Sequence, residues 1–234
     1  MKICQYFLFL MAAGLNGTPA LAQSQPALDF KWDNLFLAAA KSDEHFDFSA
    51  NTDWYMENYR PDVWRYARND EFTLQDKRGE TEKIFRDKVD QFDMDQKFVL
   101  RSTLTLGDYN FEKEIFPIKG IDAGYYWLDR SYKNGNFPRT YSAHPTNIEI
   151  LNRLPMPKAQ AKSFVNGRKD RYGGVNRRVH VKFTVKLGKM RDRSSFDCEI
   201  QQGTFYTDKG YTQPIGKGFK KAEMKSLAKT SEQD

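Results

Sequence analysis

The sequence contains few of the side chains that enzymes use most often for chemistry. Its 234 residues include only three histidines and two cysteines. It has no H-E-x-x-H, G-x-S-x-G or glycine-rich phosphate-binding motif, each of which sets a metal, a nucleophile or a phosphate in a defined local geometry. Nothing in the pattern of residues therefore points to catalysis, and we expect a non-enzymatic protein that holds no cofactor and no metal.

Long apolar runs are also missing, apart from one near the start of the chain. There Lys2 precedes the apolar run Ile3–Leu15, and the small residues Ala20-Leu21-Ala22 follow. The run is shorter than the roughly 20 apolar residues that cross a bilayer, and this order is typical of a secretory signal. We therefore expect residues 1–22 to be a signal peptide cleaved before Gln23. The protein would then be exported, periplasmic or secreted, and not transmembrane after cleavage.

The scarcity of cysteine excludes a disulfide framework. Cys4 lies in the expected signal peptide and ahead of its apolar run, where a lipoprotein cysteine would not lie, so only Cys198 remains after cleavage. A lone cysteine cannot form an internal disulfide. Cys198 alternates with Phe196 and Ile200, which favours a buried thiol over a nucleophile.

Charge is abundant but unevenly distributed. Residues 23–95 hold 10 Lys and Arg against 17 Asp and Glu, whereas residues 96–234 hold 26 against 14. The excess is strongest in residues 158–193, with 12 basic residues and only two acids. Such asymmetry suits an anionic partner, and it equally suits an acidic half that packs on a basic half.

The acidic half has the pattern of helices. Residues 29–42, 52–59 and 80–92 show apolar side chains at helical spacing, and Pro61 suits the first turn of another helix. In the helix expected at residues 80–92 we predict one apolar face, and we expect Gly79 to separate this helix from the segment before it. The residues of that face are Thr81, Ile84, Phe85, Val89 and Phe92.

The basic half has the pattern of strands. Strands are expected at residues 97–107, 108–118, 123–132 and 146–152, and a short helix at 156–167. The fold class predicted is α+β, with N-terminal helices packed on a C-terminal antiparallel sheet. We expect a signal peptide at 1–22, one domain at 23–211 with an acidic helical part (23–95) and a basic strand-rich part (96–211), and a basic flexible tail at 212–234.

A hairpin of alternating residues is the centre of the basic region. Residues 178–187 and 196–201 each alternate apolar with polar side chains, and residues 188–195 between them read as a polar loop. Pairing around that loop would set Lys186 near Asp197, and Lys182 near Glu199. Other cations have too few acids nearby and form a candidate anion-binding surface: Arg168, Lys169, Arg171, Arg177, Arg178, Lys189, Arg191 and Arg193.

The partner expected for this surface is an anionic component of the cell envelope. Lipid phosphates, an acidic polysaccharide or an acidic protein would suit it, and nucleic acid is not expected outside the cytoplasm. The predicted function is therefore an exported, periplasmic binding or interaction protein. The sequence leaves the oligomeric state open.

An aromatic segment, residues 125–141, supports an alternative. Aromatic rings beside polar side chains suit sugar rings, and the candidates for glycan binding are Tyr125, Tyr126, Trp127 and Tyr132. With a pair of carboxylates, from Asp43, Glu44 and Asp47 or from Asp93 and Asp95, the segment could also serve a cell-envelope hydrolase. The same rings equally suit the core of a sheet, and both interpretations stay open at this point.

Three short stretches resemble a known family. Asp70-Glu71-Phe72, the run Gly107–Phe111 followed by Phe116-Pro117, and the stretch Pro157–Phe164 are similar to a family of exported bacterial proteins catalogued as a domain of unknown function. The resemblance covers roughly Ala50 to Thr207. It implies a bacterial cell-envelope setting and no catalytic or binding residues.

Overall fold

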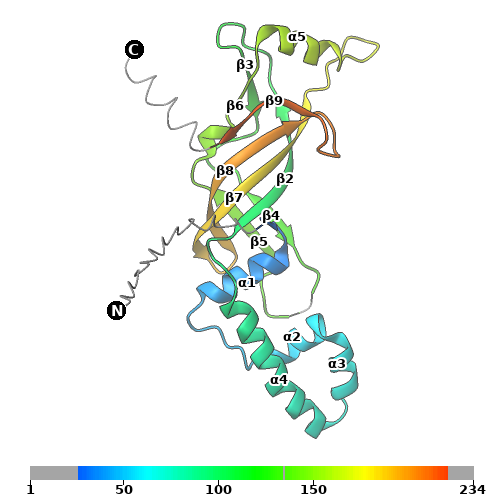
Figure 1. Cartoon of the computed structure of the whole chain (residues 1–234), viewed down its shortest axis with the longest axis vertical. Helices are drawn as coiled ribbons and strands as arrows, with labels where there is room; N and C mark the ends of the chain where they lie inside the picture. Colours follow the sequence, from blue (N-terminus) through cyan, green and yellow to red (C-terminus); the bar gives the residue numbers. More distant parts are fainter. Residues whose placement is uncertain (1–25, 134, 221–234) are drawn as a thin grey trace, which may run out of the picture.

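The computed structural model describes residues 26–133 and 135–220 and shows an elongated molecule (Figure 1). Four helices lie at one end and a fifth lies at the other, with the sheet between them. The helices are α1 (Trp32–Ser42), α2 (Thr52–Tyr59), α3 (Pro61–Ala67), α4 (Glu71–Asp90) and α5 (Lys158–Asn166). The predicted α+β class is confirmed. We call residues 32–90 the helical part.

One sheet holds all the strands of the described chain. They are β1 (Leu28–Asp29), β2 (Lys97–Leu106), β3 (Ile115–Lys119), β4 (Trp127–Arg130), β5 (Thr140–Pro145), β6 (Arg153–Pro155), β7 (Arg178–Asp192), β8 (Ser195–Tyr206) and β9 (Pro214–Lys220). The order is β4-β5-β8-β7-β2-β3-β6, with β1 beside β2 and β9 beside β8. The sheet is mostly antiparallel, as predicted, but β1 with β2 and β5 with β8 are parallel pairs.

The hairpin of β7 and β8 is longer than the sequence suggested. Residues 188–195 are not a loop, because β7 continues to Asp192 and β8 begins at Ser195. The tighter turn changes the register, so Lys186 lies opposite Glu199 and Lys182 lies opposite Thr204. Both cross-strand charge pairs that we predicted are therefore wrong. Lys186 instead forms an ion pair of 2.6 Å with Asp95.

The helix α4 also differs from its prediction. It runs without a break through Gly79 and begins after Asp70, whose carboxylate accepts a hydrogen bond of 2.8 Å from the backbone N–H of Thr73. Thr81, Phe85 and Val89 are buried as expected, so packing of this face outweighs the weak helix preference of glycine. Ile84, however, is exposed.

Two further segments depart from the expected pattern. Residues 146–152 form no strand, and Ile148–Leu151 is a 3-10 helix. The sheet also extends past the domain boundary that we placed at residue 211, because β9 pairs with β8. The expected signal peptide and residues 221–234 of the expected tail lie outside the described residues.

Aromatic rings connect the helical part to the sheet. Phe36 of α1 stacks on Trp32 with ring centroids 5.2 Å apart, and it contacts Trp54 of α2 at 5.1 Å and Phe85 of α4 at 5.9 Å. Phe137, which precedes β5, meets the same ring at 4.7 Å. The core is therefore continuous from the helices into the sheet.

We expect Gly79→Ala to stabilise the protein. A Cβ atom at residue 79 would meet no heavy atom within 4 Å, and alanine is the better helix former in the middle of α4. The free energy of unfolding should rise by about 0.5–1 kcal/mol. Chemical denaturation of the parent and the variant measures this difference.

The matched control is Gly203→Ala in β8. A Cβ atom there would collide with the Phe219 ring and would lie 3.2 Å from Cδ1 of Phe183. This variant should lose about 1 kcal/mol or more. A loss of stability in Gly79→Ala would mean that α4 is not continuous in solution.

Candidate functional site

The eight cations of the predicted anion-binding surface do not form one surface. They lie before and after β7, which has 15 residues and so spans about 45 Å at about 3.3 Å per residue. Arg168, Lys169, Arg171, Arg177 and Arg178 lie at one end of this strand, whereas Lys189, Arg191 and Arg193 lie at the other. The structure therefore brings five of them together and separates the other three.

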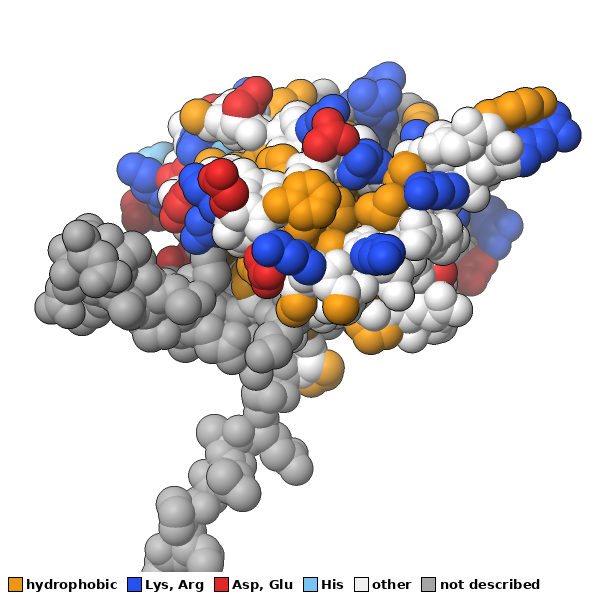
Figure 2. All heavy atoms as spheres, turned by 90° about the horizontal axis from the view of Figure 1, so that it is seen from above, with side chains coloured by type: hydrophobic (Ala, Val, Ile, Leu, Met, Phe, Trp, Pro, Cys, Tyr) orange, Lys and Arg blue, Asp and Glu red, His pale blue; other side chains and the backbone are white. Residues whose placement is uncertain are grey.

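The first group belongs to what we call the basic end, made of residues 107–114, α5 and residues 167–178. It lies at the top of Figure 1, away from α1 to α4. Figure 2 looks down on it and shows Lys and Arg side chains around hydrophobic ones. Two of its cations have partners, since Arg177 pairs with Asp108 at 2.8 Å and Lys158 lies 4.0 Å from Glu114. Within the described residues no ion pair is formed by Lys113, Lys162, Lys169, Arg171 and Arg178.

Arg168 holds the basic end together. Its Nε donates to the carbonyl of Asn176 at 2.8 Å and its Nη2 donates to the carbonyl of Arg178 at 2.5 Å, while its guanidinium lies 5.0 Å from the Phe164 ring centroid. Burial lowers its pKa from the usual value. Its Nη1 has no partner among the described residues. Arg168 therefore acts as a structural link between α5 and β7 rather than as a free cation.

Residues 170–174 form a defined turn rather than a loose loop. The carboxylate of Asp170 accepts backbone hydrogen bonds of 2.8 Å from Tyr172 and from Gly174. Within this turn, the guanidinium of Arg171 lies 4.6 Å from the ring centroid of Tyr172. The turn thus presents a cation and an aromatic ring side by side, and Tyr172 is 81% exposed.

A second exposed ring lies on residues 107–114. Phe111 is 70% exposed and packs edge-on against Tyr109 at 5.1 Å. Tyr109 in turn contacts Phe116 at 4.9 Å and donates a hydrogen bond of 2.7 Å to the carbonyl of Met156. Phe111 is therefore supported from below while its outer face meets solvent. Our sequence interpretation missed both Phe111 and Lys162, although an aromatic residue between Asn110 and Glu112 is a recognisable signal.

The other three cations lie beside a pocket at the opposite end of β7. Arg191 and Arg193 line it, and Arg191 also forms an ion pair with Asp197. The pocket has a volume of about 640 Å³ and is bounded by α1, residues 43–51, residues 136–138 and the β7–β8 hairpin. It joins part of the aromatic segment to the carboxylates of Asp43 and Asp47, and a third carboxylate, that of Asp192, also lines it.

The carboxylates of Asp43 and Asp47 already cap turns of the backbone. Asp43 accepts from the N–H of His45 at 3.0 Å, and Asp47 accepts from the N–H of Ala50 at 2.9 Å. The arrangement can bind a polar ligand.

The four rings proposed for glycan binding are divided between core and surface. Trp127 is buried and packs on Phe183 with centroids 5.2 Å apart, so it cannot stack on a sugar. Tyr125 is half-buried against Trp127. Tyr126 is exposed and stacks on the ring of His144, and Tyr132 is also exposed.

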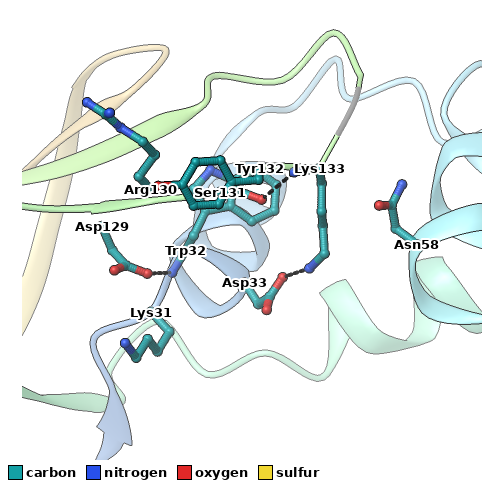
Figure 3. A pocket seen from close by; sticks show the side chains of 9 residues that line it. All are labelled: Lys31, Trp32, Asp33, Asn58, Asp129, Arg130, Ser131, Tyr132 and Lys133. Carbon is teal, nitrogen blue, oxygen red and sulfur yellow. Dashed lines mark hydrogen bonds and ion pairs between the residues drawn. The ribbon is translucent and has the colours of Figure 1, made fainter.

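Tyr132 borders another pocket, of about 520 Å³, that also contains two carboxylates (Figure 3). Asp129 accepts from the backbone N–H of Trp32 at 2.7 Å. Asp33 accepts from the hydroxyl of Tyr59 at 2.5 Å and pairs with Lys133. Burial works against ionisation of Asp33, but the bonds from Lys133 and Tyr59 outweigh it and lower the pKa of this carboxyl. Asp33 is thus held ionised and ties the segment after β4 to α1 and α2.

The remaining reactive side chains do not form a catalytic group. Burial raises the pKa of the Cys198 thiol to about 12, so it is no nucleophile at neutral pH. His180 is buried and lies 3.2 Å from the hydroxyl of Thr103. No group of three or more His, Cys, Asp and Glu side chains in residues 26–133 and 135–220 could hold a metal ion. In the same part of the chain, no helix has the length and apolar character needed to cross a bilayer.

The fold and these surfaces define an α+β domain with a group of cations at one end. A family model described as "Domain of unknown function (DUF4852)" matches residues 47–167, just over half of the chain, and the chain belongs to this family. The match confirms the resemblance to a domain of unknown function, but it ends before β7 and β8 rather than near Thr207. No curated protein and no solved structure matches the chain.

The Asp33 network makes stability depend on pH. The folded pKa of Asp33 is lower than its ordinary value of 3.8, so its stabilisation is present above that value and is lost as the pH falls through the folded pKa. Because the side chain is about half exposed, we expect Asp33→Asn to cost about 0.5–1 kcal/mol at pH 7. The difference from the parent should disappear in strong acid. Denaturation at several pH values measures it.

Glu44→Gln is the control for this experiment. It removes an exposed carboxylate that forms no ion pair within the described residues. Its effect at pH 7 should be smaller than that of Asp33→Asn. An equal effect of both variants would show that net charge, and not the contact with Lys133 and Tyr59, is responsible.

Proposed function

We propose that this protein is an exported, non-enzymatic interaction module that binds an anionic partner through its basic end. The observation that supports the proposal is the group of cations without ion pairs on α5 and residues 167–178, at the same end of the molecule as the exposed rings of Phe111 and Tyr172. Such a surface attracts negative charge, and it lies on the half of the molecule that the helical part does not cover.

The position of the acidic residues supports this proposal. Three ion pairs join the N-terminal acidic half to later cations, namely Asp29 with Arg101, Asp33 with Lys133 and Asp95 with Lys186. None of these three pairs includes a cation of the basic end. Packing of the acidic half on the basic half therefore explains some of the charge asymmetry, and the basic end keeps eight Lys and Arg side chains against four Asp and Glu side chains of its own.

We expect charge reversal at the basic end to abolish binding to a polyanion. Lys169→Glu combined with Arg171→Glu should prevent retention of the chain on a sulfated polysaccharide resin at low salt. The parent should be retained and should elute as salt rises, because the screening length falls from about 30 Å at 0.01 M to about 8 Å at 0.15 M. The salt concentration at elution is the measurement.

The molecule provides a matched control at the other end of β7. Lys189→Glu combined with Arg193→Glu makes the same change in net charge far from the basic end. Both double variants change exposed side chains and should keep the parent's unfolding midpoint. If the two variants elute alike, net charge alone governs retention and the proposed site is wrong.

Export is the second part of the proposal and has its own test. The signal pattern in residues 1–22 supports it. We expect the chain isolated from an expressing bacterium to be found outside the cytoplasm and to begin at Gln23. Fractionation followed by intact-mass measurement gives both results. A chain of full mass in the cytoplasm would contradict export.

The alternative function is a cell-envelope glycan-binding protein or hydrolase. The observation in its favour is the pocket of about 640 Å³ that joins Asn136 and Phe137 to Asp43 and Asp47. Against it, Trp127 is in the core and both carboxylates cap turns. The two functions separate in the resin assay, because binding in this pocket would survive reversal of Lys169 and Arg171.

A further inference from the structure

We infer that the anionic partner is a membrane surface, and that Phe111 and Tyr172 enter its headgroup region while the surrounding cations contact lipid phosphates. This inference rests on the proposed function and names the partner of the same site. Its basis is the coincidence of two exposed aromatic rings with unpaired cations at one end of an elongated molecule.

The two rings come from separate segments and each is fixed in place. Phe111 rests on Tyr109, which is itself bonded to the carbonyl of Met156. Tyr172 belongs to the turn closed by Asp170 and lies beside the Arg171 guanidinium. Large rings on projecting turns gain nothing from exposure to water, so their position favours contact with an apolar or interfacial partner.

The ion pairs of the basic end direct the remaining charge outward. Asp108 is paired with Arg177, Glu114 lies 4.0 Å from Lys158, and Asp170 accepts from backbone N–H groups of its own turn. Glu112, next to Phe111, is an exposed carboxylate without an ion pair within the described residues, and it stands against five cations of this end that also have none. The cations left without acids include Lys162 on α5 and both neighbours of Asp170 in the chain, Lys169 and Arg171. These side chains are exposed and flexible enough to reach phosphates around the inserted rings.

An anionic bilayer can contact both the cations and the exposed aromatic rings of this surface. Its headgroup layer attracts lysine and arginine, and its boundary with the hydrocarbon accepts aromatic rings. A soluble acidic polysaccharide would use the cations and leave Phe111 and Tyr172 in water. An acidic protein could use both, but it would have to cover rings on two separate projections.

The opposite end of the molecule offers a natural comparison. Tyr66 and Phe72, near the connection of α3 and α4, are 74% and 79% exposed. The charged side chains near them are three acids, Asp62, Asp70 and Glu71, and two cations, Arg65 and Arg68, of which Arg65 pairs with Asp62. This tip exposes aromatic rings to a similar extent as the basic end, but it has no excess of cations to attract anionic lipid. Variants at Tyr66 and Phe72 therefore show whether exposed rings without an excess of cations contribute to vesicle binding.

Sedimentation with lipid vesicles tests the inference. The parent should bind vesicles that contain phosphatidylglycerol at least tenfold more strongly than vesicles of phosphatidylcholine alone, because each cation near an anionic surface contributes about fivefold. Phe111→Ser combined with Tyr172→Ser should weaken binding to the anionic vesicles about tenfold or more. It should leave retention on the polysaccharide resin unchanged.

Two control variants make the result specific. Tyr66→Ser with Phe72→Ser removes the same amount of exposed ring at the other end and should bind vesicles like the parent. Phe111→Trp with Tyr172→Trp keeps aromatic rings on both turns and should also bind like the parent. Equal thermal unfolding of all variants shows that the substitutions act on binding and not on folding.

The outcomes distinguish this inference from the proposed function. Retention of the parent on the resin without vesicle binding would overturn the membrane partner and leave an anionic polymer as the ligand. Vesicle binding that survives loss of Phe111 and Tyr172 would overturn the role of the rings. Failure of the parent to bind either the resin or the vesicles would overturn the proposed function itself.

Discussion

The packing of aromatic rings around Phe36 is the interaction on which the arrangement of this molecule depends. Phe36 on α1 contacts rings from α2, from α4 and from the segment before β5. Pairs of this kind contribute about 0.5–1.5 kcal/mol each beyond the burial of their surface. Because α2, α3 and α4 extend past the end of the sheet, this cluster is what joins them to it.

The position of that cluster decides which surface stays open. The helical part carries much of the acidic charge and is held at one end, so its carboxylates reach cations of the sheet near the junction, as Asp33 reaches Lys133. They do not lie over α5 or residues 167–178. The charge asymmetry of the sequence therefore has two parts, an internal one at the junction and an external one at the basic end. Only the second supports a binding function.

The length of β7 has a similar consequence. Arg178 and Arg191 are 13 residues apart on one strand, and an extended chain separates them by about 43 Å at about 3.3 Å per residue. Arg191 and Arg193 consequently line a pocket with Asp43 and Asp47, and Arg191 also pairs with Asp197. The sequence analysis had grouped eight cations because they are close in the chain, but the fold places five at one end of β7 and three at the other. The same strand holds Cys198 of its partner β8 in the core, where burial suppresses its reactivity.

The sequence by itself determined the elements that depend on local rules. The alternating pattern of β2 predicted the burial of Phe98, Leu100 and Leu104, because side-chain direction alternates along a strand. Pro61 predicted the first turn of α3, because its ring fixes the backbone locally. The sequence analysis also proposed Arg171 as part of an anion-binding surface, which stays a prediction. Only the tertiary structure kept Gly79 inside α4, set the turn after Asp192, and packed Phe116 between Tyr109 and Phe164 of α5. Those outcomes depend on contacts between segments distant in the chain, whose burial energy exceeds the small local preferences that a sequence pattern records.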